Sequence, residues 1–360
     1  MMQTYKVGGY VRDMILGRDS SDVDHVVVGA SEEEMLQKGF VKVGASFPVF
    51  LHPITKEEYA FARKERKTGP GYAGFETVVN GITLEEDLAR RDLTINSIAM
   101  NDSGEYIDPF NGISDIQDRI LRHTTSAFEE DPLRVIRLAR FRASLNFKIH
   151  PTTFSLAMKM IERGDLDELS DERIIAEITK VAQSNSWSTV YEFFFCLESM
   201  GAMWQVRFFR EYIDGSVVNT LKQKQGSQQS VEINILFALI MNKKAEEETR
   251  FTSIASLVRR AAVKLQIAYN TGTVADLYEF AAVNKIWGQR IISFNQWQLL
   301  LVGSFSVERI ELMKRSIYST LDVDNSYVQK LNGNSLKGRE IGEELRRVRI
   351  AKIYETMIQN

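Results

Sequence analysis

The chain has 360 residues, of which 44% are hydrophobic and 26% are charged, an ordinary composition for a soluble globular protein with two or three domains. The formal net charge of −3 shows no overall basic character, so any nucleic-acid binding would have to rest on local basic surfaces. A single cysteine, Cys196, excludes an intramolecular disulfide framework. Because no signal-like or membrane-length apolar stretch is present, we expect a cytoplasmic protein.

Residues 1–123 mix short apolar runs with glycine-containing turns, a pattern that indicates an α/β domain. Three apolar runs predict strands, at 26–28, 47–51 and 59–62. Thr83 and Glu86 have the spacing of a capping box, which predicts a helix that starts at Thr83 and runs towards Met100. Asn111 and Gly112 form a turn signal.

From about residue 124 the pattern becomes helical, because apolar residues such as Leu138, Phe141 and Leu145 recur at helical spacing. No proline follows Pro151, so nothing interrupts long helices. We therefore expect three parts: an α/β head (1–123), a helical neck (124–225), and a helical body and tail (226–360).

Two aspartates, Asp22 and Asp24, precede the apolar run at 26–28. Residues i and i+2 of a strand project from one face, and two carboxylates directed at one point repel each other unless a cation lies between them. Such oxygen ligands favour Mg²⁺, and two ions can activate an attacking hydroxyl and stabilise a leaving pyrophosphate. An isolated Asp-x-Asp is common in loops, so the pair indicates a metal site only in combination with the neighbouring motifs.

The preceding segment contains groups suited to a phosphate. Gly8 and Gly9 allow the backbone to approach a phosphate closely, and Arg12, on a short helix, can meet the charge of a triphosphate. His25 begins the apolar run on the face opposite Asp24, where we expect a packed or surface histidine rather than a metal ligand.

Four motifs follow one another along the chain: Gly-Gly-x-Val-Arg-Asp at 8–13, Asp-x-Asp at 22–24, Arg-Arg-Asp at 90–92 and Glu-Asp-Pro-Leu-Arg at 130–134. As a set they resemble the motifs of class II CCA-adding enzymes, tRNA nucleotidyltransferases of the polymerase-β-like superfamily that are related to bacterial poly(A) polymerases. The resemblance implies an α/β nucleotidyltransferase head with a small mixed five-stranded sheet and helices, followed by an all-α neck, body and tail.

The same resemblance implies a reaction. The 3′-hydroxyl of tRNA would attack the α-phosphate of CTP or ATP without a template, to add or repair the terminal CCA, and pyrophosphate would leave. Asp22 and Asp24 would hold two Mg²⁺ ions. Arg91 would lie at the nucleotide and Asp92 at its ribose 2′-hydroxyl. A third carboxylate often assists in this superfamily, and Glu65 is a candidate for it.

Four polar residues are spaced by three along one side of a predicted helix, namely Asp131, Arg134, Arg137 and Arg140, and its packing side carries Leu133, Ile136, Leu138 and Phe141. Cytosine and adenine share an exocyclic amine beside an unprotonated ring nitrogen. An aspartate can accept from the amine while an arginine donates to the nitrogen. The resemblance assigns this reading to Asp131 and Arg134 and nucleotide binding to Arg137 and Arg140. A solvated arginine face is the alternative.

Basic residues cluster at 63–67 and near the C-terminus, at Lys337, Arg339, Arg346, Arg347, Arg349 and Lys352. They could neutralise phosphates of tRNA, whose acceptor and TΨC arms would be recognised by shape while the 3′ end reaches the head. No membrane or protein partner is evident. Residues 68–75 are glycine-rich and match a loop that in the family helps the pocket change from CTP to ATP; a tolerated surface loop is the alternative.

Some relatives carry an HD-type hydrolase in the body, which needs histidine ligands. All four histidines lie within the first 150 residues, and residues 239–244 read Leu-Ile-Met-Asn-Lys-Lys, so we expect this hydrolase site to be lost. Two other functions stay open: a poly(A) polymerase or an enzyme that adds only part of CCA, and a catalytically silent RNA-binding protein.

Overall fold

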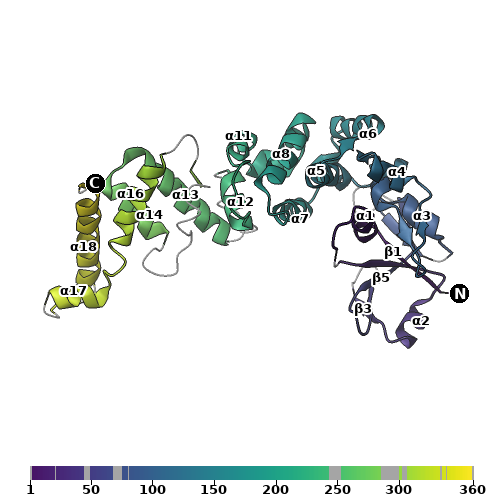
Figure 1. Ribbon diagram of the computed structural model, residues 1–360, viewed down its shortest axis with the longest axis horizontal. Coiled ribbons are helices and arrows are strands. Elements are labelled where there is room, and N and C mark those ends of the chain that lie inside the picture. The colour runs from purple at the N-terminus through teal and green to yellow at the C-terminus, as the bar shows by residue number, and fades with distance from the viewer. Residues whose placement is uncertain are drawn as a thin grey trace. The chain divides into compact units, whose positions relative to one another are not determined.

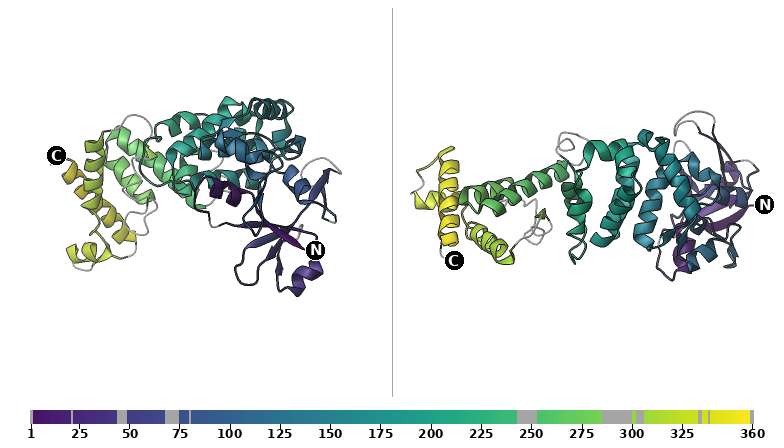
Figure 2. Two further views of the ribbon diagram at one scale, coloured as in Figure 1. Left: turned by 45° about the vertical axis from the view of Figure 1, so that its right-hand side comes forward. Right: turned by 90° about the horizontal axis from the view of Figure 1, so that it is seen from above.

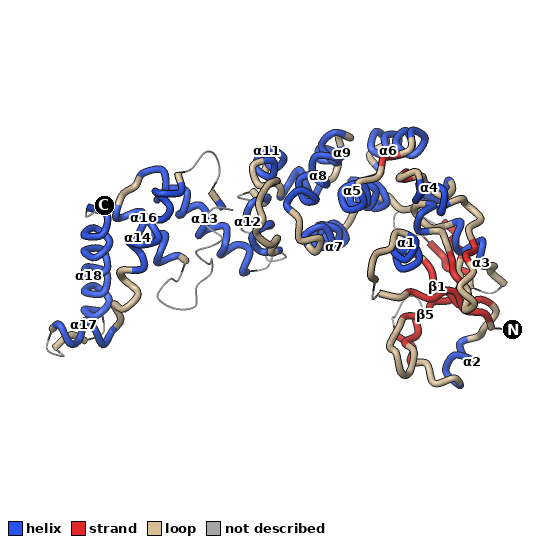
Figure 3. Tube along the Cα trace, in the orientation of Figure 1, coloured by secondary structure: helices blue, strands red, loops and turns tan. Residues whose placement is uncertain are grey.

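The computed structural model describes residues 2–20, 22–43, 49–67, 75–79, 81–242, 253–284, 300–301, 306–332, 335–337 and 339–358. The chain forms two compact units, Met1–Glu177 with Cys196–Arg207 and Ile178–Phe195 with Phe208–Asn360. All named strands lie in the first unit, and the described part of the second is helical (Figure 3). The predicted α/β head with an α-helical remainder is therefore confirmed, while the division at residues 123 and 225 stays a prediction.

A mixed sheet forms the centre of the first unit (Figure 1), with the strand order β3-β4-β5-β2-β1-β8-β9. The strands are β1 Gln3–Val7, β2 Asp24–Val28, β3 Val41–Val43, β4 Val49–Leu51, β5 Glu58–Phe61, β8 Ala99–Met100 and β9 Tyr106–Ile107. Strand β2 runs antiparallel to β1 and parallel to β5. The sheet has seven strands rather than the expected five, because the two-residue strands β8 and β9 extend the edge beside β1.

Two smaller sheets accompany it. Strand β6 (Lys64–Lys67) pairs antiparallel with β7 (Phe75–Val78), and β10 (Ile120–Leu121) pairs parallel with β11 (Lys148–Ile149). These strands belong to the N-terminal part of the chain, which is coloured purple to teal in Figure 2. Residues 68–74, between β6 and β7, lie outside the described residues, as does the start of the strand expected at 47–51.

Alternating residues of the central strands pack on two faces of the sheet. On one face, Val26 packs with Leu88 of α3 (Leu84–Ala89) in a cluster that also contains Val7, Ala62 and Ala99. On the other face, Val27 packs with Met35 of α2 (Glu32–Gln37), Phe50 and Phe61. A helix therefore covers each face, and the side of α3 is the one on which the Asp24 side chain lies.

Helix α3 begins as predicted but ends earlier. The Thr83 hydroxyl accepts from the Glu86 amide at 3.2 Å, and the Glu86 carboxylate accepts from the Thr83 amide at 3.1 Å. The helix stops at Ala89, the 3₁₀ turn η2 (Thr94–Asn96) follows, and Met100 lies in β8. The expectation of one helix towards Met100, with residues 90–92 late upon it, was wrong.

Pairing with a distant segment explains the early end. The Thr94 amide donates to the Arg122 carbonyl at 2.9 Å, and the Thr124 amide donates to the Asp92 carbonyl at 3.3 Å. These bonds flank an antiparallel bridge between Leu93 and His123, in which Leu93 is extended (φ −128°, ψ 147°), a conformation that a continuing helix could not adopt. A long-range contact therefore overrides the local helical tendency.

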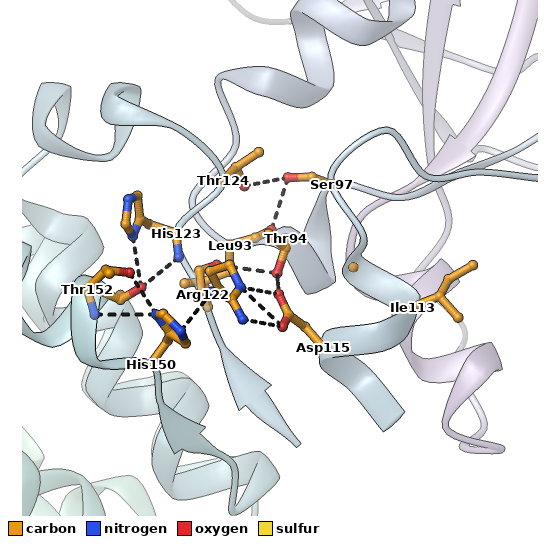
Figure 4. Close-up of polar contacts among 12 residues, drawn as sticks. Leu93, Thr94, Ser97, Ile113, Asp115, Arg122, His123, Thr124, His150 and Thr152 are labelled. Carbon is orange, nitrogen blue, oxygen red and sulfur yellow. Dashed lines mark hydrogen bonds and ion pairs between the residues drawn. The ribbon is translucent and has the colours of Figure 1, made fainter. Parts of the chain in front are cut away.

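Polar side chains brace the same segment (Figure 4). The Thr94 hydroxyl donates to Asp115 of α4 (Gly112–Gln117) at 2.7 Å, and Arg122 reaches Asp115 at 3.0 Å. Arg122 also contacts the Nε2 atom of His150 at 2.8 Å, at the start of α6 (Pro151–Glu162). Close packing adds to this network, because a Cβ atom at Gly112 would lie 2.2 Å from the Thr94 carbonyl oxygen.

The remaining helices account for most of the rest of the described chain. They are α1 Gly9–Ile15, α5 Leu133–Leu145, α7 Asp171–Ala182, α8 Trp187–Ser199, α9 Ala202–Gln205, α10 Arg207–Tyr212, α11 Val217–Lys222, α12 Ile233–Ile240, α13 Ser253–Thr271, α14 Val274–Val283, α16 Val307–Tyr318, α17 Asn325–Leu331 and α18 Arg339–Ile358. The packing side predicted for α5 is buried at Leu133, Ile136, Leu138 and Phe141. Within the described residues, no helix combines the length and apolarity needed to cross a bilayer.

The tight packing at Gly112 predicts that Gly112→Ala lowers stability. The added methyl group would overlap the Thr94 carbonyl oxygen, and overpacking of this kind costs about 1–3 kcal/mol. We expect a lower midpoint in thermal unfolding followed by circular dichroism. Gly342→Ala is the control, because Gly342 lies in α18 with nothing within 4 Å of an added Cβ, and it should leave the midpoint unchanged or raise it. Equal midpoints for both variants would contradict the packing argument.

Candidate functional site

Three carboxylates lie near one another at the start of β2. In the strand register, Asp24 pairs with Val7 of β1 and with Glu58 of β5. Alternation places Asp24 and Glu58 on the same face of the sheet as α3, and Asp22 lies just before the strand; all three residues are exposed. Burial raises the pKa of Asp24, and the charges of Asp22 and, less strongly, Glu58 add to this against the lowering effect of Arg91. This region therefore favours a cation.

A hollow of about 220 Å³ opens beside these carboxylates, and its charged lining residues are Asp24, Glu58, Arg63, Asp87, Arg90 and Arg91. Neither Glu58 nor Asp87 was among the site residues predicted from the sequence. The sequence predicted the apolar strand next to Glu58 and the capped helix that contains Asp87. The strand register that brings Glu58 beside Asp24, however, cannot be predicted from local sequence. Glu65, the earlier candidate for a third carboxylate, has its side chain outside the described part of the structure.

The carboxylates fit a metal ion that is only partly bound by protein. In the described residues, no three His, Cys, Asp or Glu side chains converge closely enough to hold an ion by themselves. Mg²⁺ commonly uses one or two protein carboxylates and completes its octahedron with water and substrate phosphate oxygens. Asp22 and Asp24, whose like charges raise the pKa of Asp24, match that donor set.

The Gly8-Gly9 turn provides room for two guanidinium groups. Gly8 has a φ of 72°, a conformation that favours glycine, and a Cβ atom there would lie 3.1 Å from Nη1 of Arg91. At Gly9 a Cβ atom would lie 3.5 Å from Nη2 of Arg12. The structure thus brings together Gly8, Gly9, Arg12 and Arg91, which the sequence had placed in two separate motifs.

A buried carboxylate orients the arginine pair after α3. Asp87 contacts Arg90 at 2.8 Å and Arg91 at 3.1 Å, and its side chain is fully buried. Burial alone would raise the pKa of Asp87, but the charges of Arg91 and Arg90 more than offset this and lower it. Arg90 also donates to the Arg63 carbonyl at 3.1 Å. Arg91 also lies against the Gly8 turn.

A second buried carboxylate, Asp92, connects the head to α5. One oxygen of Asp92 accepts from Nε and Nη2 of Arg137, each at 2.7 Å. The other accepts from the Leu93 amide at 2.9 Å and from Nδ2 of Asn96 at 3.0 Å. Burial opposes the charged form of Asp92, but Arg137 and the Asn96 hydrogen bond outweigh it, so its pKa lies well below the ordinary range.

Glu177 of α7 is a third buried carboxylate with arginine partners. It accepts from Nε of Arg140 at 2.5 Å and lies 3.8 Å from Nη1 of Arg137. The Phe141 ring lies beneath three guanidinium groups, with its centroid 4.1 Å from Cζ of Arg140, 5.5 Å from that of Arg137 and 5.4 Å from that of Arg12. Sequence reasoning missed Glu177, because nothing local to it indicates which arginines it meets.

The predicted base-reading residues lie at the start of α5 with their polar atoms engaged. Arg134 is buried and donates to the carbonyls of Ala127 and Arg90, both at 2.6 Å. Asp131 accepts from the Leu133 amide at 3.1 Å and from Arg173 at 2.7 Å. A base that used this pair would therefore meet groups that already have protein partners.

The C-terminal basic residues have more acidic neighbours than their sequence suggests. Besides the pairs Arg339–Glu343 at 2.7 Å and Arg347–Glu344 at 2.5 Å within α18, Lys352 meets Asp322 at 2.8 Å. Arg346 lies 3.6 Å from Glu279, and Arg349 donates to the Val323 carbonyl at 2.6 Å.

Residues 243–244, part of the segment where the hydrolase site was expected to be lost, lie outside the described residues.

Comparison with known proteins agrees with this geometry. Residues 4–122 match the family model of the poly A polymerase head domain. The CCA-adding enzyme of Francisella tularensis subsp. novicida is 57% identical over 183 residues, which cover 50% of this chain and 50% of that protein. The chain therefore spans about half the length of the curated relatives it matches. The resemblance predicted from the four motifs is confirmed.

Solved structures extend the likeness in fold to the whole chain. A complex of a CCA-adding enzyme with ATP superposes with a TM-score of 0.71 at 19% identity, covering 99% of this chain and 89% of that one. The Thermotoga maritima CCA-adding enzyme complexed with tRNA gives a TM-score of 0.68 at 19% identity and covers 99% and 91% of the two chains. At such identities the likeness establishes the fold alone.

The buried Asp87 predicts a loss of stability in acid. Its pKa is lower in the folded chain than the ordinary value of 3.8, so its contribution is complete above that value and disappears as the pH falls through the folded-state pKa. We expect the thermal unfolding midpoint of the wild-type chain to decrease as the pH is lowered below about 4. The thermal midpoint of Asp87→Asn should be lower than that of the wild type at pH 7, but it should depend less on pH. Parallel curves for the two chains between pH 3 and 7 would contradict this role.

Proposed function

We propose that this chain is a CCA tRNA nucleotidyltransferase that adds or repairs the 3′-terminal CCA of tRNA from CTP and ATP without a template. The observation that carries the proposal is the meeting of Asp24, Arg91 and the Gly8 turn at one point of a head domain of the poly A polymerase type. Relatives and structural neighbours named as CCA-adding enzymes, including complexes with ATP and with tRNA, support it. We propose that it acts in the cytoplasm.

In this proposal Asp22 and Asp24 hold two Mg²⁺ ions together with the phosphates of the substrate. Bound there, the ions supply Lewis-acid activation of the attacking 3′-hydroxyl and charge neutralisation at the departing pyrophosphate. Glu58 adds negative charge beside Asp24 and so strengthens the attraction for cations. The position of Asp24 at the first residue of a paired strand keeps its carboxylate in a fixed direction.

The arginines meet the nucleotide from two sides. Gly8 and Gly9 let the triphosphate approach the backbone. Arg12 and Arg91, whose guanidinium groups lie beside these two glycines, donate hydrogen bonds to the oxygens of the triphosphate. Arg137 and Arg140 approach from α5. The ionised Asp92 carboxylate would accept a hydrogen bond from the ribose 2′-hydroxyl. This contact would favour ribonucleotides over deoxyribonucleotides.

Base choice would come from Asp131 and Arg134. Cytosine and adenine offer the amine and ring nitrogen that this pair needs, whereas uracil and guanine would leave both protein groups unpaired, at about 1–3 kcal/mol for each. In the described structure the pair is engaged with Arg173 and two backbone carbonyls. Those contacts satisfy the groups until a base of the right pattern replaces them.

The RNA would be held mainly by local basic surfaces, because the net charge of the chain is −3. The basic residues of α18 are the strongest candidates, because the side chains of Arg339 and Arg347 are exposed although each is paired with a glutamate of the same helix. We further propose that no HD-type hydrolase activity accompanies the transfer reaction, because the histidine ligands are missing from residues 151–360.

Loss of either metal-binding carboxylate tests the proposal. Asp22→Ala and Asp24→Ala should each lower CMP and AMP incorporation by about a thousandfold, because several kcal/mol of transition-state stabilisation depend on the bound ions. Asp19→Ala is the matched control, since Asp19 is an exposed acid three residues before Asp22. Incorporation from labelled CTP or ATP with Mg²⁺ is measured on tRNA that ends before, within or after CCA.

The same assay separates the alternatives. A CCA-adding enzyme extends the two incomplete tRNAs and stops at the complete end. Continued addition of AMP to the complete tRNA would indicate a poly(A) polymerase, and addition to only one of the incomplete tRNAs would indicate a partial activity. RNA binding without incorporation would identify a silent RNA-binding protein and refute the proposal.

A further inference from the structure

Asn96 lies between two groups of the candidate site that come from different elements. Its carbonyl oxygen Oδ1 accepts from Nη1 of Arg12 on α1 at 2.8 Å, and its Nδ2 donates to Oδ1 of Asp92 at 3.0 Å. Asp92 in turn holds Arg137 of α5 at 2.7 Å. One buried amide therefore connects the arginine of the Gly8-Gly9 turn with the carboxylate that orients an arginine of the neck helix.

The chemistry of the two partners requires a side chain that both accepts and donates. A guanidinium group can only donate hydrogen bonds, and an ionised carboxylate can only accept them. An amide offers one of each at a fixed separation, so the orientation of Asn96 is determined by its neighbours. Aspartate at this position could accept from Arg12 but would repel Asp92, and leucine could do neither.

The segment that carries Asn96 is held by helix α4 and by Thr124. The Thr94 hydroxyl is bonded to Asp115 at 2.7 Å, and the Ser97 hydroxyl is bonded to Thr124 at 2.8 Å (Figure 4). Gly112 brings α4 so close that no side chain fits between it and the Thr94 carbonyl. Because this turn is fixed, Asn96 can set the positions of Arg12 and Asp92 rather than follow them.

We propose that Asn96 is a positioning residue that aligns Arg12 with Asp92, so that the phosphate-binding and ribose-reading groups are set together. The inference rests on the proposed function, in which Arg12 meets the triphosphate and Asp92 the 2′-hydroxyl. Without Asn96, Arg12 keeps its paired contact with Asp13 at 2.9 and 2.8 Å and its place over the Phe141 ring, but loses its connection to Asp92. Asp92 keeps Arg137 and the Leu93 amide and loses its only side-chain partner from η2 among the described residues.

Two substitutions separate the contacts. Asn96→Leu removes both hydrogen bonds at similar size, so the KM for CTP should rise and the preference for CTP over dCTP should fall, each by about tenfold or more. Asn96→Asp keeps an acceptor for Arg12 but removes the donor to Asp92. It should therefore leave the KM for CTP within about threefold of wild type while the CTP to dCTP preference still falls by about tenfold.

Asn101→Leu is the matched control for a structural role. Asn101 shapes the turn between β8 and β9 by accepting from the amides of Ser103 and Glu105, at 3.0 and 2.9 Å. Its loss should lower the unfolding midpoint without changing the CTP to dCTP preference. The measurement is steady-state incorporation of CMP and dCMP into tRNA that lacks CCA, with thermal unfolding of each variant.

The outcomes distinguish this inference from the function on which it rests. A wild-type chain that incorporates no nucleotide would overturn both. An active wild-type chain with an unchanged CTP to dCTP preference in Asn96→Asp would overturn the positioning role alone. A loss of preference in Asn96→Asp but not in Asn101→Leu would support it, even if Asn96→Leu does not fold.

Discussion

Buried ion pairs between carboxylates and arginines are the constraint on which the candidate site depends. Asp87, Asp92 and Glu177 are nearly inaccessible, and each holds one or two guanidinium groups. A guanidinium without such a partner would be costly to pack beside a sheet, and a carboxylate without its arginine would be equally costly. The pairs therefore allow several arginines to pack within the head and against α5, and those of Asp87 line the hollow beside Asp24.

The ion pairs could not form without the shape of the head. The register of β2 against β1 and β5 places Asp24 beside Glu58, and the early end of α3 turns residues 90–92 back towards the sheet. As a result, Arg91 reaches the Gly8 turn while Asp92, one residue later, faces α5. Two neighbours in the chain thus serve different parts of one site because α3 has already ended at Ala89.

Most of the site's polar groups are already satisfied within the protein. Asp92, Asp131, Arg134 and Arg140 each have close protein partners, so a nucleotide gains only the difference between its own contacts and those it replaces. Such an arrangement favours selectivity over affinity. A substrate with the wrong pattern of donors and acceptors breaks the internal contacts without replacing them, whereas the right substrate exchanges one satisfied set for another.

The sequence alone determined the features that depend on neighbours in the chain. An apolar run just after Asp24 predicted the strand at 26–28, the capping box predicted the beginning of α3, and helical spacing predicted the buried side of α5 around Leu138 and Phe141. Only the tertiary structure decided where α3 ends, that Glu58 lies beside Asp24, and that Asn96 joins Arg12 to Asp92. These features arise from contacts between segments that are distant in sequence, such as residues 92–94 with 122–124, and such contacts form only when both segments have been brought together by the rest of the fold, so no local preference predicts them.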